Sequence, residues 1–143
     1  MSLLLKESRA VGGIAGILYT FLPNSGHSDW ANHVTFRTVA EKAGVPEFWQ
    51  SGSKRPALTA LLERTLDQKR SKFEKLIIEI VRAGILYRDK NSNPVTAEEI
   101  DNLNGYLLEV SFKFPELWDV AFRTSLKNNK TNNPLSAQQA LSL

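Results

Sequence analysis

Apolar residues recur at helical spacing along most of the chain, and the alternation typical of strands is nearly absent. The clearest stripe follows Pro56 and occupies positions 58, 61, 62, 66, 73, 76, 77, 80 and 81. This spacing predicts one long central helix, which Gly84 would end. A continuous helix would place Lys69 on the apolar face. Either the helix kinks over residues 67–72, or the Lys69 stem lies along the core and its charge reaches solvent.

A second apolar stretch, residues 10–22, contains no charged side chain. It is shorter than the roughly 20 residues that a bilayer-spanning helix needs, so we expect a buried helix and no membrane span. Gly12 and Gly16 have the spacing at which two helix backbones approach closely, which predicts tight helix–helix packing there.

The same N-terminal stretch has an alternative interpretation as a secretory signal over residues 1–28. Lys6 and Arg9 would supply its basic start, and Gly26-His27-Ser28 its cleavage site. Glu7 fits that arrangement poorly. We therefore expect a retained segment and a cytoplasmic protein.

Helix start signals divide the rest of the chain. Thr35 can cap a short helix over residues 36–43, and Gly44 follows where a left-handed residue is favoured. A second short helix with Pro46 in its first turn comes next. The sequence from Thr96 to Glu99 forms a capping box, in which each side chain accepts from the other residue's backbone N–H.

The C-terminal third predicts one more helix, which begins at residues 114–115. Its apolar side chains would face inward: Leu117, Trp118, Ala121 and Phe122. Residues 85–87 and 110–112 are the only short strand candidates. Residues 127–143 open with a run of Lys, Asn and Thr that cannot bury apolar surface, so we expect a polar linker or tail, with room for one short amphipathic helix.

Together these patterns predict an all-α fold, a compact bundle of about five to six helices with one long central helix. The chain has 143 residues, a length typical of one domain, which we place at residues 1–126. It has no cysteine, which excludes disulfides, thiolate metal sites and a cysteine nucleophile.

Candidate catalytic chemistry is sparse. His27, Asp29 and His33 could supply three metal ligands, but no further acid lies nearby to support them, so we expect no metal. The chain contains neither a phosphate-binding glycine loop with its lysine nor a Gly-x-Ser-x-Gly nucleophile turn. We therefore expect no cofactor and no enzymatic activity.

One local sequence carries a functional resemblance. The octet Thr-Val-Ala-Glu-Lys-Ala-Gly-Val at residues 38–45 resembles the first helix and turn of the helix-turn-helix in LacI-type repressors. Ala40 is small enough for close helix packing, and Gly44 would make the turn. The resemblance implies a recognition helix over residues 46–51 that enters the major groove of DNA. Here this chain departs from the family, because Gly52 ends the segment early.

Positive charge is concentrated in the middle of the chain. The net charge is +3, yet residues 34–90 hold twelve basic and seven acidic side chains. On a continuous helix Arg64, Lys75 and Arg82 would share one stripe, and Lys54 and Arg55 lie just before it. Such a stripe can hold phosphates or dock an acidic partner.

The adjacent aromatic residues Phe48 and Trp49 lie between a proline and a glycine, where complete burial of both is difficult. An exposed tryptophan beside basic residues is a plausible interface anchor. We predict a non-enzymatic helical interaction or regulatory module, which can be part of a larger protein or complex. A protein partner is expected, and a homo-oligomer is compatible. The alternative is a DNA- or RNA-binding regulator that uses residues 35–52 and 56–82.

Overall fold

Helices make up all the regular secondary structure in the part of the chain that the computed structural model describes, residues 4–22, 35–50 and 52–126. They are α1 (Leu5–Leu18), α2 (Phe36–Ala43), the 3-10 turn η2 (Pro46–Phe48), α3 (Lys54–Gln68), α4 (Arg70–Lys90), α5 (Ala97–Glu109), α6 (Pro115–Trp118) and α7 (Val120–Ser125). The predicted all-α class is confirmed. Within these described ranges, no helix combines the length and apolar character needed to cross a membrane.

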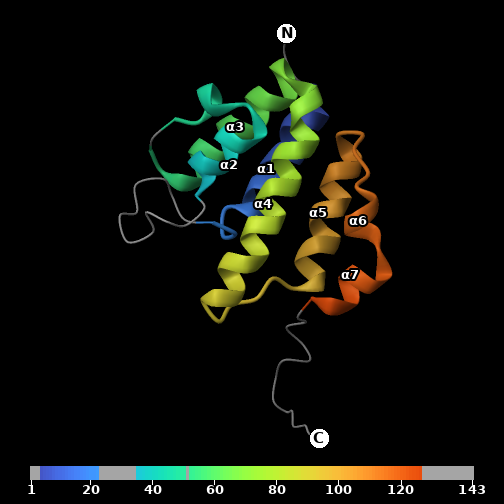
Figure 1. The fold of residues 1–143 in the computed structure, drawn as a ribbon. Coiled ribbons are helices and arrows are strands. Elements are labelled where there is room, and N and C mark those ends of the chain that lie inside the picture. The colour runs from blue at the N-terminus through green and yellow to red at the C-terminus, as the bar shows by residue number, and fades with distance from the viewer. Residues whose placement is uncertain (1–3, 23–34, 51, 127–143) are drawn as a thin grey trace, which may run out of the picture.

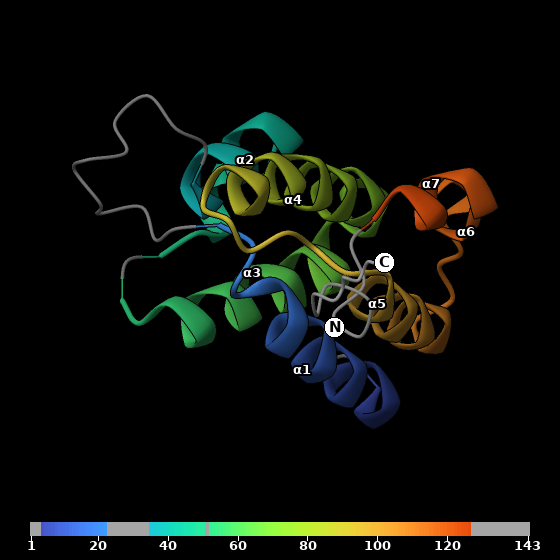
Figure 2. The same ribbon diagram turned by 90° about the horizontal axis from the view of Figure 1, so that it is seen from below.

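The longest helix, α4, runs along the length of the molecule (Figure 1). In that view α2 and α3 lie to its left, α5 to α7 to its right, and α1 behind it. Helix α1 packs between α3 and α5, while α4 packs against α2 and α3. The view from below shows α1 as the outermost of these helices on its side (Figure 2).

The apolar N-terminal stretch is part of the core, as expected. Ala10, Val11, Ile14, Ala15 and Leu18 on α1 have no exposed surface. The cleavage site of the alternative secretory signal lies outside the described residues.

Both predicted helix caps are confirmed. The Thr35 side chain accepts a hydrogen bond from the backbone N–H of Thr38, and Gly44 ends α2 with a φ of 88°. At the start of α5, the N–H of Glu99 donates to Thr96 Oγ1 at 3.1 Å, and the N–H of Thr96 donates to Glu99 Oε1 at 3.0 Å. These caps satisfy backbone donors that a helix start otherwise leaves unpaired.

The predicted long helix is in fact two helices, which separate at Lys69. This residue has φ −136° and ψ 58°, outside the helical region, and its side chain leaves the core to pair with Glu47 at 2.6 Å. The hydrogen bond from Lys69 lowers the pKa of Glu47. Of the two alternatives for Lys69, the interruption of the helix is correct, and it is a break rather than a kink.

Gly84 does not end the helix, because α4 continues to Lys90. A Cβ at this position would lie 2.4 Å from the Phe21 ring, so glycine is needed here for close packing. The predicted strand at residues 85–87 lies within the same helix, and residues 110–112 form a turn in which Ser111 has a φ of 68°. Both strand candidates were therefore wrong.

The expected Gly12–Gly16 packing contact is also wrong in detail. Gly13 makes the close approach, since its Cβ would lie 2.4 Å from the Tyr106 ring of α5. In the described part of the chain, nothing lies within 4 Å of a Cβ built at Gly12, and only the Arg55 guanidinium approaches Gly16.

The last predicted helix is divided at Asp119, which caps α7 by accepting from the Phe122 N–H at 2.9 Å. Leu117 is buried as expected and Phe122 packs partly buried against the core, whereas Trp118 and Ala121 are exposed. The predicted tail, residues 127–143, lies outside the described residues.

Candidate functional site

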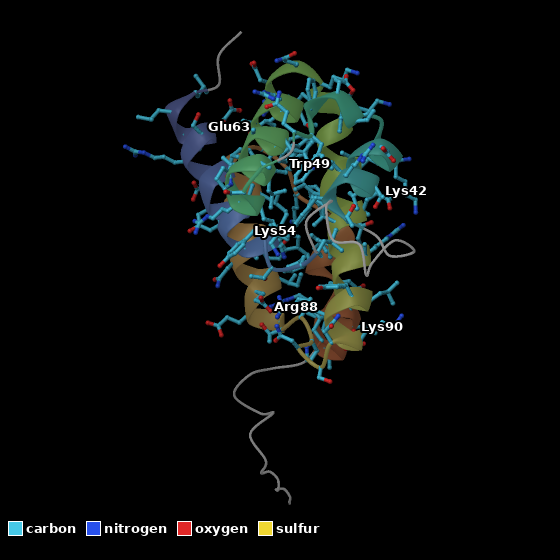
Figure 3. The ribbon with its side chains drawn as sticks, turned by 90° about the vertical axis from the view of Figure 1, so that its left-hand side faces the viewer. Lys42, Trp49, Lys54, Glu63, Arg88 and Lys90 are labelled. Carbon is cyan, nitrogen blue, oxygen red and sulfur yellow. The ribbon has the colours of Figure 1, made fainter. Side chains whose placement is uncertain are left out.

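The two aromatic residues singled out in the sequence differ in burial. Phe48 belongs to the core, because η2 directs its ring inward. Trp49 is half-buried and stacks on Phe36 with ring centroids 6.0 Å apart. The pair therefore contributes at most one partly exposed ring to the surface (Figure 3).

The helix-turn-helix resemblance holds for the first helix and the turn, which are α2 and Gly44. The next segment is the single 3-10 turn η2, with Trp49 already in an extended conformation. The expected short helix over residues 46–51 is thus limited to three residues. A recognition helix needs several turns to place side chains along a groove.

The predicted basic stripe is divided by the break at Lys69. Arg64 belongs to α3, whereas Lys75 and Arg82 belong to α4, so the three do not share one helix face. The metal candidates His27, Asp29 and His33 lie outside the described residues. Among the residues that are described, no group of three or more potential ligands could hold a metal ion.

Lys54 and Arg55, in the first turn of α3, both lie over the ring of Tyr19 at the end of α1. Their charged groups are 5.9 Å and 5.5 Å from the ring centroid. Lys54 also donates to the carbonyl of Leu22 at 3.2 Å, and its partial burial lowers the pKa of its amine. Lys54 is therefore part of the contact between α1 and α3, while Arg55 is exposed beside it.

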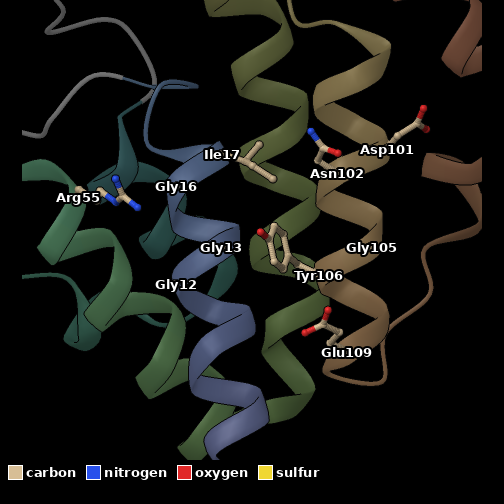
Figure 4. Close-up of a pocket in the computed structure, with 10 residues that line it drawn as sticks. All are labelled: Gly12, Gly13, Gly16, Ile17, Arg55, Asp101, Asn102, Gly105, Tyr106 and Glu109. Atoms are coloured by element: carbon tan, nitrogen blue, oxygen red, sulfur yellow. The ribbon is translucent and has the colours of Figure 1, made fainter.

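A groove of about 640 Å³ opens beside Arg55, over the outer surface of α1 (Figure 4). Its floor is the α1 backbone at Gly12, Gly13 and Gly16. We call this surface of α1, together with the adjoining wall of α5, the α1–α5 face. Tyr106 projects from α5 across the floor toward Gly13.

Packing within this chain explains only some of the glycines on the α1–α5 face. A glycine in the interior of a helix costs about 1 kcal/mol relative to alanine. At Gly13 the Tyr106 ring requires it, whereas none of the described residues comes within 4 Å of a Cβ at Gly12 or Gly105. Two helix glycines that point at the same groove therefore lack an internal packing reason.

Charged residues line both sides of the groove, and the Asp101 carboxylate points away from α1 (Figure 4). Arg55 lies on the α3 side, and Asp101 and Glu109 lie on the α5 side. Asp101 pairs with Arg123 at 2.7 Å and remains nearly half exposed. The face thus presents backbone, an aromatic ring and charges of both signs.

Of these residues, the sequence pointed only to Arg55, Gly12 and Gly16. Gly105 and Tyr106 were missed, and the isolated glycine within the predicted helix after Thr96 was the signal that could have found them. Comparison of the chain with protein-family models, curated proteins and solved structures finds no match. The functional inference therefore rests on the geometry and charge of the α1–α5 face.

Proposed function

We propose that this chain is a non-enzymatic helical protein-interaction module that binds its partner through the α1–α5 face. The observation that supports this most directly is the pair of open glycines, Gly12 and Gly105. Each weakens its own helix by about 1 kcal/mol relative to alanine, and no contact with the described residues offsets that cost. A partner helix that packs directly on the exposed backbone would offset it.

Exposed apolar side chains extend the same face. Leu5 lies seven residues before Gly12, hence on the same line of α1, and is 67% exposed. Tyr106 is 36% exposed beside the groove. Apolar and aromatic contact at the centre with charged residues at the rim is the usual composition of a protein interface.

Binding to nucleic acid is the second candidate, and the placement of Lys54 and Arg55 over Tyr19 favours it. Cations beside an aromatic ring are the combination that holds single strands. Fluorescence anisotropy with random single-stranded DNA and RNA tests this directly. Binding should fall steeply as salt rises and should be lost in the Lys54→Glu/Arg55→Glu double variant. No binding at low salt would eliminate this candidate.

Site-specific crosslinking tests the proposed protein interaction. A photoreactive amino acid at Leu5 should crosslink to protein, whereas the same group at Leu86 on α4 should not. The two leucines are matched, at 67% and 73% exposed. Adding Gly12→Leu should abolish the Leu5 crosslink, because the new side chain fills the groove. Equal crosslinking at both positions, or a Leu5 crosslink that survives Gly12→Leu, would contradict the proposal.

A further inference from the structure

We infer that this chain can exchange its N-terminal half with a second copy of itself, by straightening at Lys69 so that α3 and α4 become one continuous helix. The exchanged half contains α1, α2, η2 and α3, and the other half contains α4 to α7. In the resulting dimer each half packs on the complementary half of the other copy. The inference concerns the break between α3 and α4, so it does not depend on the α1–α5 face.

The break between α3 and α4 has no stop signal in the local sequence. Lys69 follows the last residue of α3 and precedes the first residue of α4, and its side chain forms no cap hydrogen bond with the described residues. Residues 66–72, Leu-Asp-Gln-Lys-Arg-Ser-Lys, contain neither glycine nor proline, and glutamine, lysine and arginine favour helix. The local sequence therefore favours a continuous helix over the break.

Another one-residue break in this chain does have a local cause. Asp119 separates α6 from α7, and its carboxylate accepts a hydrogen bond from the Phe122 N–H at 2.9 Å. That bond satisfies a donor at the start of α7, as an N-cap does. The Lys69 side chain has no acceptor to offer the first N–H groups of α4. A continuous helix would pair those groups with carbonyls of α3.

Only surface contacts of Lys69 itself favour the break. Residues 68–72 are all exposed, so straightening the backbone there uncovers no buried side chain of this segment. Lys69 pairs with Glu47 at 2.6 Å and lies over the Phe48 ring at 5.9 Å. Exposed ion pairs of this kind contribute little to stability. These are the contacts that the continuous helix would lose.

The core contacts between the two halves can form equally well between two copies. Within one chain, α1 packs on α5 and α2 packs on α4. Phe21 lies against Gly84, and Lys42 pairs with Glu79 at 3.5 Å. Because the halves are consecutive in the sequence, the same contacts form between copies once the segment at residue 69 is straight. Exchange of an identical element is a low-cost route to a dimer for this reason.

The apolar stripe suits the exchanged arrangement. Leu66 and Phe73 are both buried and lie seven residues apart, so a continuous helix over residues 54–90 presents its apolar side chains on one face. Two such helices can pack antiparallel, with α3 of each copy against α4 of the other. Lys69 lies on the same face, where its charge weakens the dimer. We therefore expect the monomer at about 5 μM and the dimer near about 1 mM.

Refolding at two concentrations tests whether the dimer forms. Exchange requires the halves to separate, which exposes the shared core, so the full chain is first unfolded in urea. Refolding at about 1 mM should give a species of twice 16.0 kDa that is nearly absent after refolding at about 5 μM. Size-exclusion chromatography with light scattering measures both masses. Gly12→Leu, which fills the groove on the α1–α5 face, should leave this species unchanged.

Crosslinking between two single-cysteine chains tests whether the dimer is an exchanged one. The native chain has no cysteine, and Lys42 on α2 contacts Glu79 on α4. When Lys42→Cys and Glu79→Cys chains are refolded together at about 1 mM, a short bismaleimide should join the two different chains. Without exchange, the two positions meet only within one copy, so the mixture would give no such product. The Lys42→Cys/Glu79→Cys double variant refolded at about 5 μM is the control and should give a crosslinked monomer.

Proline at residue 71 distinguishes the two states. Ser71 is exposed in the first turn of α4, where proline is tolerated because the N–H has no partner within the helix. In a continuous helix the same residue is interior, and proline removes a hydrogen bond and collides with the preceding turn. Ser71→Pro should therefore weaken the dimer at least about a hundredfold and leave a helical monomer by circular dichroism. Ser71→Ala is the matched control and should still form the dimer.

Glu47→Gln should have the opposite effect. It removes the ion pair with Lys69, which exists only while α3 and α4 are separate, and should strengthen the dimer by about two- to tenfold. Glu41→Gln is the matched control. Its exposed pair with Arg37 lies within α2 and is present in both states, so dimerisation should not change.

Three outcomes would overturn the exchanged dimer. They are a chain that stays monomeric after refolding at about 1 mM, a dimer that gives no crosslink between the two single-cysteine chains, and a dimer that persists in Ser71→Pro. None of these results bears on the Leu5 crosslink, so the proposed function is tested separately.

Discussion

An arginine, an aromatic ring and a helix glycine come together twice in this molecule, once in the interior and once on the surface. In the interior, Arg88 lies over Phe21 at 5.4 Å, and Phe21 packs against Gly84. On the surface, Arg55 lies over Tyr19 at 5.5 Å and beside Gly16. The residue types are alike, but their surroundings are very different.

In the interior group, every guanidinium nitrogen of the arginine has a hydrogen-bond partner. The Arg88 side chain is only 7% exposed and binds both carboxylate oxygens of Glu99, at 2.8 Å and 3.0 Å. It also donates to the carbonyls of Asn93 and Pro94, so the end of α4, the loop and the start of α5 are joined. A buried guanidinium is tolerated because its donors find partners.

In the surface group, the arginine is exposed to solvent. Among the described residues, no hydrogen bond or ion pair holds the Arg55 guanidinium, which lies over the Tyr19 ring. That guanidinium also covers Gly16, since a Cβ built there would lie 3.1 Å from Arg55 Nη2, the end of a flexible side chain. The same combination of residues therefore joins helices where the arginine donors have partners, and leaves the guanidinium exposed where they do not.

The largest expected effect is at Arg88. Arg88→Met should lower the free energy of unfolding by about 3–5 kcal/mol, because Glu99 and the loop carbonyls lose their partner while partly buried. Urea denaturation measures this loss. Arg82→Met, on the exposed side of the same helix, is the control and should change stability by less than about 0.5 kcal/mol. A loss below about 1 kcal/mol for Arg88→Met would mean that the network contributes little.

Gly84→Ala comes next, with an expected loss of about 1–3 kcal/mol from overpacking. The added Cβ would collide with Phe21, and this outweighs the gain of about 1 kcal/mol in helix propensity. A double-mutant cycle with Phe21→Leu checks the cause. The two changes should be strongly non-additive, and simple additivity would show that Phe21 is not responsible.

Gly12→Ala should have the opposite sign. The site is open, so alanine brings only its helix propensity and should raise the free energy of unfolding by about 0.5–1 kcal/mol. Thermal and urea unfolding of the monomer at low concentration measure this gain. Destabilisation would mean that the groove is filled within the monomer, contrary to the structure.

The smallest effect is expected at Lys69, the residue at the helix break. Its pair with Glu47 is about half exposed, so the Coulombic gain is offset by hydration and side-chain entropy. Lys69→Met should leave the midpoint of thermal unfolding unchanged. A large decrease would show that this surface pair is needed to hold the break between α3 and α4.

The sequence predicted helices, caps and core well because these depend on neighbours along the chain. Thr35 and Thr96 satisfy their own helix starts, and the apolar stripe marks the buried face. The break at Lys69 was harder to locate. Leu66 and Phe73 are both buried and lie seven residues apart, so the stripe stays in register while the backbone changes direction.

The structural role of each glycine was the hardest feature to predict from the sequence. Gly44 and Gly84 both follow an apolar stripe, yet only Gly44 has the positive φ that ends a helix. The role of Gly84 depends on Phe21, which is distant in sequence. The groove was missed for the same reason, because Gly12 and Gly105 face it from helices that only the tertiary fold brings together.

The double role of Glu99 has a consequence for local opening of the structure. Its Oε1 accepts from the backbone N–H of Thr96, which starts α5, and from Arg88, near the end of α4. Neither helix end can fray without releasing the same carboxylate. The amide of Glu99 and those of the last turn of α4 should therefore exchange with deuterium through one shared opening event, and the two ends should behave as one cooperative unit.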